Sequence, residues 1–133
     1  MAVNPHSTGI AVAAIAVTTS AAGAFSATTL TMTGRVLQYR YVPDPSTPLA
    51  TGTNMVIAGA TTAVAIVTAS SIGTSAFQKA PRQPTHAVAD GSALLYAAGG
   101  TAQSDFIYVD EPLTLTITSG GNALKGTFYI WVG

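Results

Sequence analysis

An alternation of aliphatic and threonine side chains near the C-terminus limits what this chain can fold into. Residues 113–118 alternate leucine or isoleucine with threonine, which on an extended backbone places the two kinds of side chain on opposite faces. Residues 127–132 repeat the pattern, with Phe128, Ile130 and Val132 on one face. No apolar stripe with the 3.6-residue period of a helix persists for three turns anywhere in the chain. The sequence therefore predicts strands throughout.

Glycines between the strand-like segments predict hairpins. Tight hairpin turns need a positive φ, which glycine adopts without steric cost. The sequence accordingly predicts three hairpins, each around a glycine: residues 113–118 with 127–132, residues 92–97 with 105–109, and residues 54–58 with 62–69.

A longer strand-like segment changes its apolar face at a glycine. Leu30 and Met32 lie at even positions, whereas Tyr39 and Tyr41 lie at odd ones, and Gly34 separates the two sets. A β-bulge shifts the alternation of faces by one residue. We therefore expect a bulge at Gly34.

The strand count and the absence of helices predict the fold class. Residues 10–17 are ambiguous, because their alanines favour a helix whereas Val12, Ile15 and Val17 favour a strand, and we interpret them as a strand. Eight or nine short strands without crossover helices predict an all-β fold, an antiparallel β-sandwich of jelly-roll-like form. We expect residues 10–133 to form a single domain. Residues 1–9, which are polar and turn-forming, are expected to form an extended N-terminal arm.

Charge is unusually scarce. Only 8% of the 133 residues are charged, against about 25% in a typical soluble domain, and Ala, Thr, Gly and Ser make up half the chain. A neutral surface promotes association, so we expect a homo-oligomer. Five basic side chains balanced by five acidic ones do not provide the basic patch that nucleic-acid binding requires. Residues 9–17 are too short an apolar run to span a bilayer, so neither nucleic acid nor membrane is an expected partner.

No catalytic, metal or cofactor site is predicted. Cysteine is absent, which excludes thiolate metal sites and cysteine nucleophiles. His86, Asp90 and Ser92 are the residue types of a nucleophilic triad, but a triad converges from separate elements and needs an oxyanion hole, and no G-x-S-x-G motif is present. These three side chains are expected to be loop residues.

The carboxylates near the C-terminal strands are a second candidate cluster. Asp105, Asp110 and Glu111 supply the ligand type that calcium prefers, or the pair that glycoside hydrolysis uses. Neighbouring residues on an extended backbone point to opposite sides, which separates Asp110 from Glu111. We expect them to cap a turn before Pro112.

Two groups of residues are candidates for contacts with other molecules. Tyr129 and Trp131 lie on the face of their strand opposite the predicted core, where they suit either a subunit interface or a platform for stacking on a sugar. Asn4, Pro5 and His6 belong to the N-terminal arm, which is suited to adding a strand to a neighbouring sheet.

Four segments resemble small β-rich virion proteins of tailed bacteriophages, the capsid decoration or cement proteins: residues 87–96, 105–109, 112–118 and 126–133. The resemblance implies a non-enzymatic protein that binds the major capsid protein on the outer face of the virion and reinforces the head. It also favours a trimer, with a dimer as the alternative, and assembly in the host cytoplasm. A carbohydrate-binding β-sandwich module of a phage tail or fibre remains the alternative function.

Overall fold

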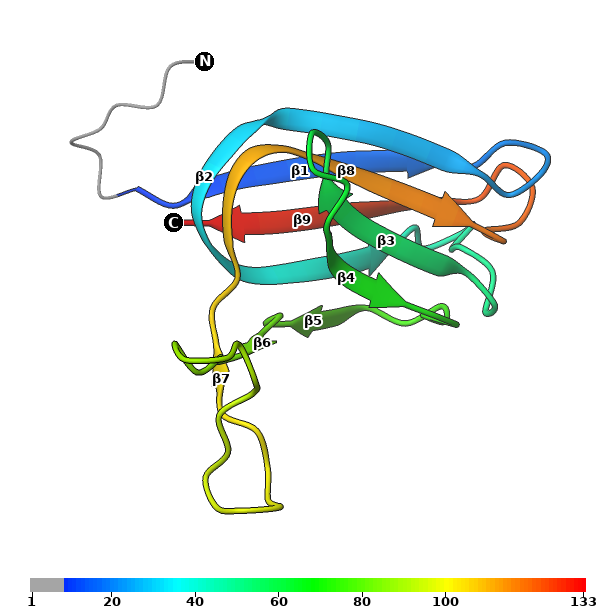
Figure 1. Cartoon of the computed structure of the whole chain (residues 1–133). Helices are drawn as coiled ribbons and strands as arrows, with labels where there is room; N and C mark the ends of the chain where they lie inside the picture. Colours follow the sequence, from blue (N-terminus) through cyan, green and yellow to red (C-terminus); the bar gives the residue numbers. More distant parts are fainter. Residues whose placement is uncertain (1–8) are drawn as a thin grey trace.

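The computed structural model describes residues 9–133, and its strands form two layers (Figure 1). Over this range the chain contains strands and no helix. The strands are β1 (Ala11–Thr18), β2 (Phe25–Pro43), β3 (Asn54–Gly59), β4 (Ala65–Ala69), β5 (Phe77–Lys79), β6 (Gln83–Pro84), β7 (Ser104–Asp105), β8 (Tyr108–Thr118) and β9 (Lys125–Val132).

Strand β2 belongs to both layers. Its first part, residues 25–35, pairs with β8, and β8 in turn pairs with β3 and β3 with β4. Its second part, residues 36–43, pairs with β9, which pairs with β1, and β5 lies on the other side of this part. Every pair is antiparallel, and β6 with β7 forms a separate small sheet. The all-β, antiparallel sandwich is confirmed, whereas the jelly-roll arrangement is not.

The predicted C-terminal hairpin is wrong. β8 and β9 do not pair with each other but lie on either side of β2, one in each layer. Each strand has one aliphatic face, and the two faces meet across the core, where Leu115 and Phe128 are fully buried. Pairing edge to edge would have put both apolar faces on the same side of one sheet. Residues 119–124 instead cross from one layer to the other.

The other two predicted hairpins have different outcomes. The hairpin around Gly59 is confirmed as β3 and β4, although β4 begins only at Ala65. The hairpin around residues 99–100 is wrong, because residues 92–97 form no strand and make only isolated bridges. The short β6 and β7 pair at the base of this segment, which leaves residues 85–103 outside both layers.

Strand β2 bends where it passes between the layers. Gly34 has a φ of +134°, which glycine tolerates. The predicted bulge is not at Gly34 itself: the register skips between Thr28 and Thr31 opposite β8, and between Val36 and Gln38 opposite β9. The skip opposite β8 turns Leu30 outward. The skip opposite β9 moves the buried side chains of β2 from even-numbered to odd-numbered positions. Gly34 therefore lies at the bend, and one bulge lies on each side of it in the sequence.

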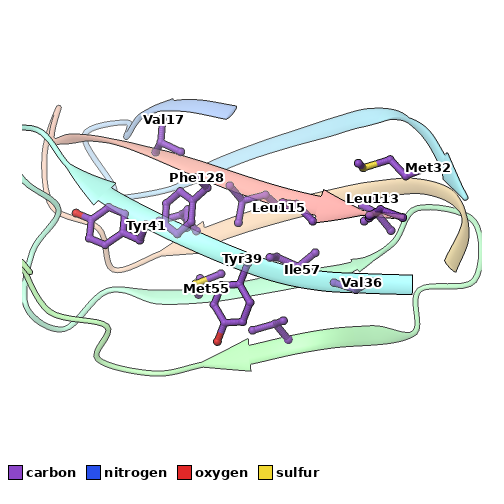
Figure 2. Close-up of a cluster of buried hydrophobic side chains, with 14 of the residues drawn as sticks. Val17, Met32, Val36, Tyr39, Tyr41, Met55, Ile57, Leu113, Leu115 and Phe128 are labelled. Atoms are coloured by element: carbon purple, nitrogen blue, oxygen red, sulfur yellow. The ribbon is translucent and has the colours of Figure 1, made fainter. Parts of the chain in front are cut away.

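A single cluster of buried side chains fills the space between the layers (Figure 2). Phe128, Ile130 and Val132 belong to it, as predicted. The ring of Phe128 stacks on that of Tyr41, with centroids 4.9 Å apart. The Tyr41 hydroxyl accepts a hydrogen bond of 3.2 Å from the backbone N–H of Leu49, so its polar atom is paired inside the core. The strand predicted at residues 10–17 is confirmed as β1.

Two crossing loops pack together at one end of the sandwich. The backbone N–H of Gly120 donates to the carbonyl of Gly23 over 2.9 Å. The buried hydroxyl of Thr19 donates to the carbonyl of Gly121 (2.6 Å) and accepts from the N–H of Leu124 (3.0 Å). These bonds join the loop before β2 to the loop before β9, and thereby hold the two layers together at this end.

Candidate functional site

Only two of the five predicted interface residues lie in the part of the chain that the structure describes. Asn4, Pro5 and His6 lie outside the described residues. Tyr129 and Trp131 lie on the outer face of β9 and are half-buried. Their rings stack on each other, with centroids 5.8 Å apart and planes 29° apart.

A cation and an amide complete this aromatic surface. The guanidinium of Arg40, on the neighbouring β2, lies 4.8 Å from the ring centroid of Trp131. Its Nε donates to the side-chain oxygen of Gln78 on β5 over 2.9 Å. A sugar platform needs ring faces open to solvent, but these contacts engage ring faces within the protein. The geometry therefore favours packing over carbohydrate binding at Tyr129 and Trp131.

The triad residue types do not form a triad. The carboxylate of Asp90 accepts from both the backbone N–H (3.0 Å) and the hydroxyl (2.7 Å) of Ser92, two residues away. The Ser92 hydroxyl is thus donated to Asp90, and His86 forms a backbone bridge with Ala93. These bonds shape a loop, as expected, and the one from the Ser92 N–H is the largest cause of the lowered pKa of Asp90.

The three carboxylates of the second candidate cluster accept hydrogen bonds at three separate places in the fold. Asp105 accepts from the next backbone N–H, at Phe106, and Asp110 accepts from the hydroxyl of Thr33 over 2.8 Å. Glu111 reaches the turn between β3 and β4, where it accepts from the N–H of Thr62 over 2.9 Å. Glu111 therefore caps a turn, but a turn on the neighbouring hairpin rather than the local one that the sequence predicted.

Two negative observations hold for residues 9–133. No three His, Asp or Glu side chains in this range gather closely enough to hold a metal ion. The same residues contain no helix of the length and apolarity needed to cross a membrane.

Acid is expected to weaken the fold partly through Glu111. Its pKa lies below the ordinary value of 4.5, first because of the Thr62 N–H and then because of the Thr62 hydroxyl and the Thr61 N–H. A carboxyl whose pKa falls on folding stabilises the fold at neutral pH, and this contribution is lost as the pH drops through 4.5 to the folded value. Glu111→Gln should therefore lower stability at pH 7 and flatten its fall below pH 4.5, measured by urea unfolding from pH 7 to 3. Parallel pH profiles for the variant and the parent chain would contradict this assignment.

The structure reveals a surface that the sequence analysis missed. Residues 85–103 leave the sandwich as a projection, drawn in yellow-green at the bottom of Figure 1. Its apolar side chains face solvent: Val88 is fully exposed, Tyr96 is 76% exposed, and Leu94 and Leu95 are each nearly 40% exposed. A signal was present, because residues 94–96 are consecutive apolar residues, and a strand cannot turn all three toward one core.

Backbone bonds give this projection a defined shape. The N–H of Leu94 donates to the carbonyl of Thr85 (2.7 Å), and the N–H of Gln103 donates to that of Leu94 (2.8 Å). Nearer the tip, the N–H of Tyr96 donates to the carbonyl of Thr101 over 3.0 Å. The exposed apolar side chains are thus presented on a preformed backbone.

The projection is anchored at its base by an aromatic ring between cations. The guanidinium groups of Arg35 and Arg82 lie 5.1 Å and 4.1 Å from the ring centroid of Phe106. Arg35 lies at the bend of β2, while Arg82 and Phe106 flank the β6–β7 pair. Cation–π contacts therefore join the base of the projection to the sandwich.

The chain was compared with known proteins. No family model, curated protein or solved structure matches it. Only the residues of this chain and their geometry therefore point to its function.

Proposed function

We propose that this chain is a non-enzymatic virion protein that binds the outer surface of a tailed-phage head and stabilises it. The projection, residues 85–103, carries the proposal. It presents Val88, Leu94, Leu95 and Tyr96 to solvent on a backbone that is already hydrogen-bonded. Exposed apolar patches on protein surfaces mark interaction sites, and a preformed backbone reduces the entropy lost on binding.

The chemistry of this surface suits a protein partner. Within residues 85–103 the only formally charged side chain is Asp90, whose carboxylate is engaged by Ser92. Binding through such a surface depends on apolar burial and backbone pairing rather than on charge. We propose the major capsid protein and further copies of this chain as partners. The resemblance to capsid decoration proteins, rather than this surface, singles out the capsid protein and favours a trimer over a dimer. Affinity should change little between low and molar salt.

The polar residues support a structural rather than a catalytic role. Asp90 bonds within its own loop, whereas Asp110 and Glu111 bond to a hydroxyl and a backbone N–H on neighbouring elements of the sandwich. Each of these carboxylates thus stabilises a local structure, as we expect in a protein that binds a partner and catalyses no reaction.

Rebinding to bare heads tests the proposal. Heads of the phage whose genome carries the gene, prepared without this protein, are mixed with the purified chain and sedimented, and bound density is located by cryo-electron microscopy. We expect saturable binding and new density on the outer face of the shell. A gene outside any phage genome, or no density on the head, would overturn the proposal. Density on the tail together with binding on a glycan array would support the carbohydrate module instead.

Two substitutions on the projection should reduce this binding. Leu95→Ser with Tyr96→Ser removes apolar surface without touching the core, so the free energy of unfolding should change little. Retention on heads should fall at least tenfold if these side chains anchor the interface, because truncating a hot-spot aromatic costs about 2 kcal/mol or more. The matched control is Val42→Ser with Val64→Ser, which removes two valines that are 40% and 65% exposed on the sandwich. Equal retention of both variants would show that the projection does not contact the shell.

A further inference from the structure

A groove lies between β1 and the first part of β2. These two strands diverge from the loop at residues 19–24 (Figure 1) and leave an open space of about 440 Å³ between them. Residues 11–16 line one side of this groove, and residue 25 together with residues 27–32 lines the other. Pockets of about 300–1,000 Å³ enclose small organic ligands, so the groove has room for two large side chains.

The groove is apolar and uncharged. Ile15 and Phe25 line it and pack against the core, yet both are only half-buried. Val12 on one side of the groove and Leu30 on the other are 52% and 68% exposed. None of the lining residues that the structure describes carries a charge. The groove therefore suits an occupant whose side chains are apolar and uncharged.

The projection carries a segment of matching chemistry. Its chain makes a turn in which the N–H of Tyr96 donates to the carbonyl of Thr101 over 3.0 Å. Leu94 and Leu95 directly precede this turn, and residues 94–101 contain no charged side chain. The remaining residues of this segment are alanine, glycine and threonine, so the turn itself is narrow. We call residues 94–101 the apolar loop.

The apolar loop lies far from the groove of its own chain. The groove lies between β1 and β2 at the top of Figure 1, whereas the projection extends from β6 and β7 at the bottom. No residue of the range 85–103 lines the groove. Backbone hydrogen bonds shape the projection, and cation–π contacts join its base to the sandwich. A loop that enters the groove must therefore come from a second copy.

We propose that the apolar loop of one copy docks into the groove of the next, so that the chain assembles head to tail. The side chains of Leu95 and Tyr96 then cover the half-buried core residues of the groove. Thr31, which is exposed on the β2 side, offers a hydroxyl to the Tyr96 phenol. A contact between two different surfaces generates a ring when its rotation closes.

This inference rests on the proposed function, which includes further copies of the chain among its partners, and it names the two surfaces that join them. The preformed turn reduces the entropy lost on docking. Because both surfaces are uncharged, docking desolvates no ionised side chain. Self-association should therefore change little between low and molar salt.

Mixing two defective variants tests the contact. In the loop variant, Leu95→Ser with Tyr96→Ser removes the large apolar side chains. In the groove variant, Val12→Glu with Leu30→Glu places a charge on each side of the groove, at side chains exposed enough for the sandwich to keep its fold. Light scattering and sedimentation velocity measure the mass of each purified variant and of their equimolar mixture, and urea unfolding checks that each variant is folded.

A matched control carries the same charges elsewhere on the sandwich. Val42→Glu with Val64→Glu changes two exposed valines that do not line the groove. We expect the control and the parent chain to form oligomers of the same mass. The loop variant and the groove variant, each alone, should be monomeric at the same concentration.

The mixture of the two defective variants should form dimers. The groove variant supplies an intact apolar loop, and the loop variant supplies an intact groove. The dimer should not grow further, because its remaining loop and its remaining groove are both defective. A contact between two like surfaces would give no such rescue.

Three results of the mixing test would overturn the proposal. The first is a parent chain that is monomeric at micromolar concentration. The second is a mixture that stays monomeric although the parent chain forms oligomers. The third is an oligomer that persists in the loop variant or in the groove variant, which would place the interface elsewhere on the molecule.

Cross-linking between chains is a second measurement, because the chain contains no cysteine of its own. A chain with Ala97→Cys is mixed with a chain with Leu30→Cys and oxidised mildly, and mass spectrometry quantifies the disulfide between unlike chains. This disulfide should form at least tenfold faster than in a mixture of Ala97→Cys with Val64→Cys. Val64 is about as exposed as Leu30, at 65%, but does not line the groove. Equal rates would show that the apolar loop does not enter the groove.

Both measurements use the purified chain without phage heads, which separates this proposal from the proposed function. Oligomers that pass the mixing test but do not bind heads would support the docking contact and overturn the proposed function. A monomeric chain that binds heads would do the reverse.

Discussion

Ile130→Asp is expected to leave most of the chain unfolded. Ile130 is 1% exposed and lies between Ala13 of β1 and Tyr39 of β2 in the core-facing register of β9. An uncompensated buried charge costs about 3–5 kcal/mol, and the lost burial of isoleucine adds about 2 kcal/mol. The total is comparable to the whole stability of a small domain, about 5–15 kcal/mol.

The same substitution on an exposed face is the control for this prediction. Thr116 also lies within a paired strand, but its side chain is exposed. Thr116→Asp should therefore fold, with a cooperative urea transition close to that of the parent chain. Circular dichroism and urea unfolding of both variants measure the difference. A soluble, cooperatively unfolding Ile130→Asp protein would show that this face of β9 is not in the core.

Gly23→Ala is expected to cause the second largest loss of stability, about 2–5 kcal/mol. Gly23 has a φ of +77°, where an L-residue costs about 1–2 kcal/mol. An added Cβ would also lie 2.8 Å from the backbone nitrogen of Gly120 and 2.9 Å from that of Gly121. Relieving this overlap separates the loops that hold the two layers together, which adds about 1–3 kcal/mol.

Two further glycines separate these contributions. Gly73 has a φ of +79° but no neighbour within 4 Å of an added Cβ. Gly73→Ala should therefore lose only the backbone term of about 1–2 kcal/mol. Gly52 has neither a positive φ nor a close neighbour, so Gly52→Ala should lose nothing measurable. Similar losses at Gly23 and Gly73, measured by urea unfolding, would show that the contact with Gly120 is not important.

The roles of single polar side chains could be predicted from the sequence where local bonds decide them. Asp90 and Ser92 are two residues apart, so their predicted role in a loop needs no tertiary information. The expectation that Glu111 caps the turn before Pro112 is wrong, because its partner, Thr62, lies 49 positions away in the turn between β3 and β4. The apolar projection was missed because residues 92–97 were assigned to a strand. Whether an apolar residue covers a core or faces solvent depends on what the fold places beside it.

For the two C-terminal strands, strand identity and the direction of each side chain were determined by the sequence alone. The alternation at residues 113–118 and 127–132 specified both strands and their buried faces, because a period of two allows only one apolar face. Which strands pair was decided only by the tertiary structure. Hairpin β3–β4 formed as its turn predicts, whereas β8 and β9 separated into different layers on either side of β2. Local patterns specify a face but not a neighbour, since two apolar faces can be buried by meeting across a core as well as by lying side by side.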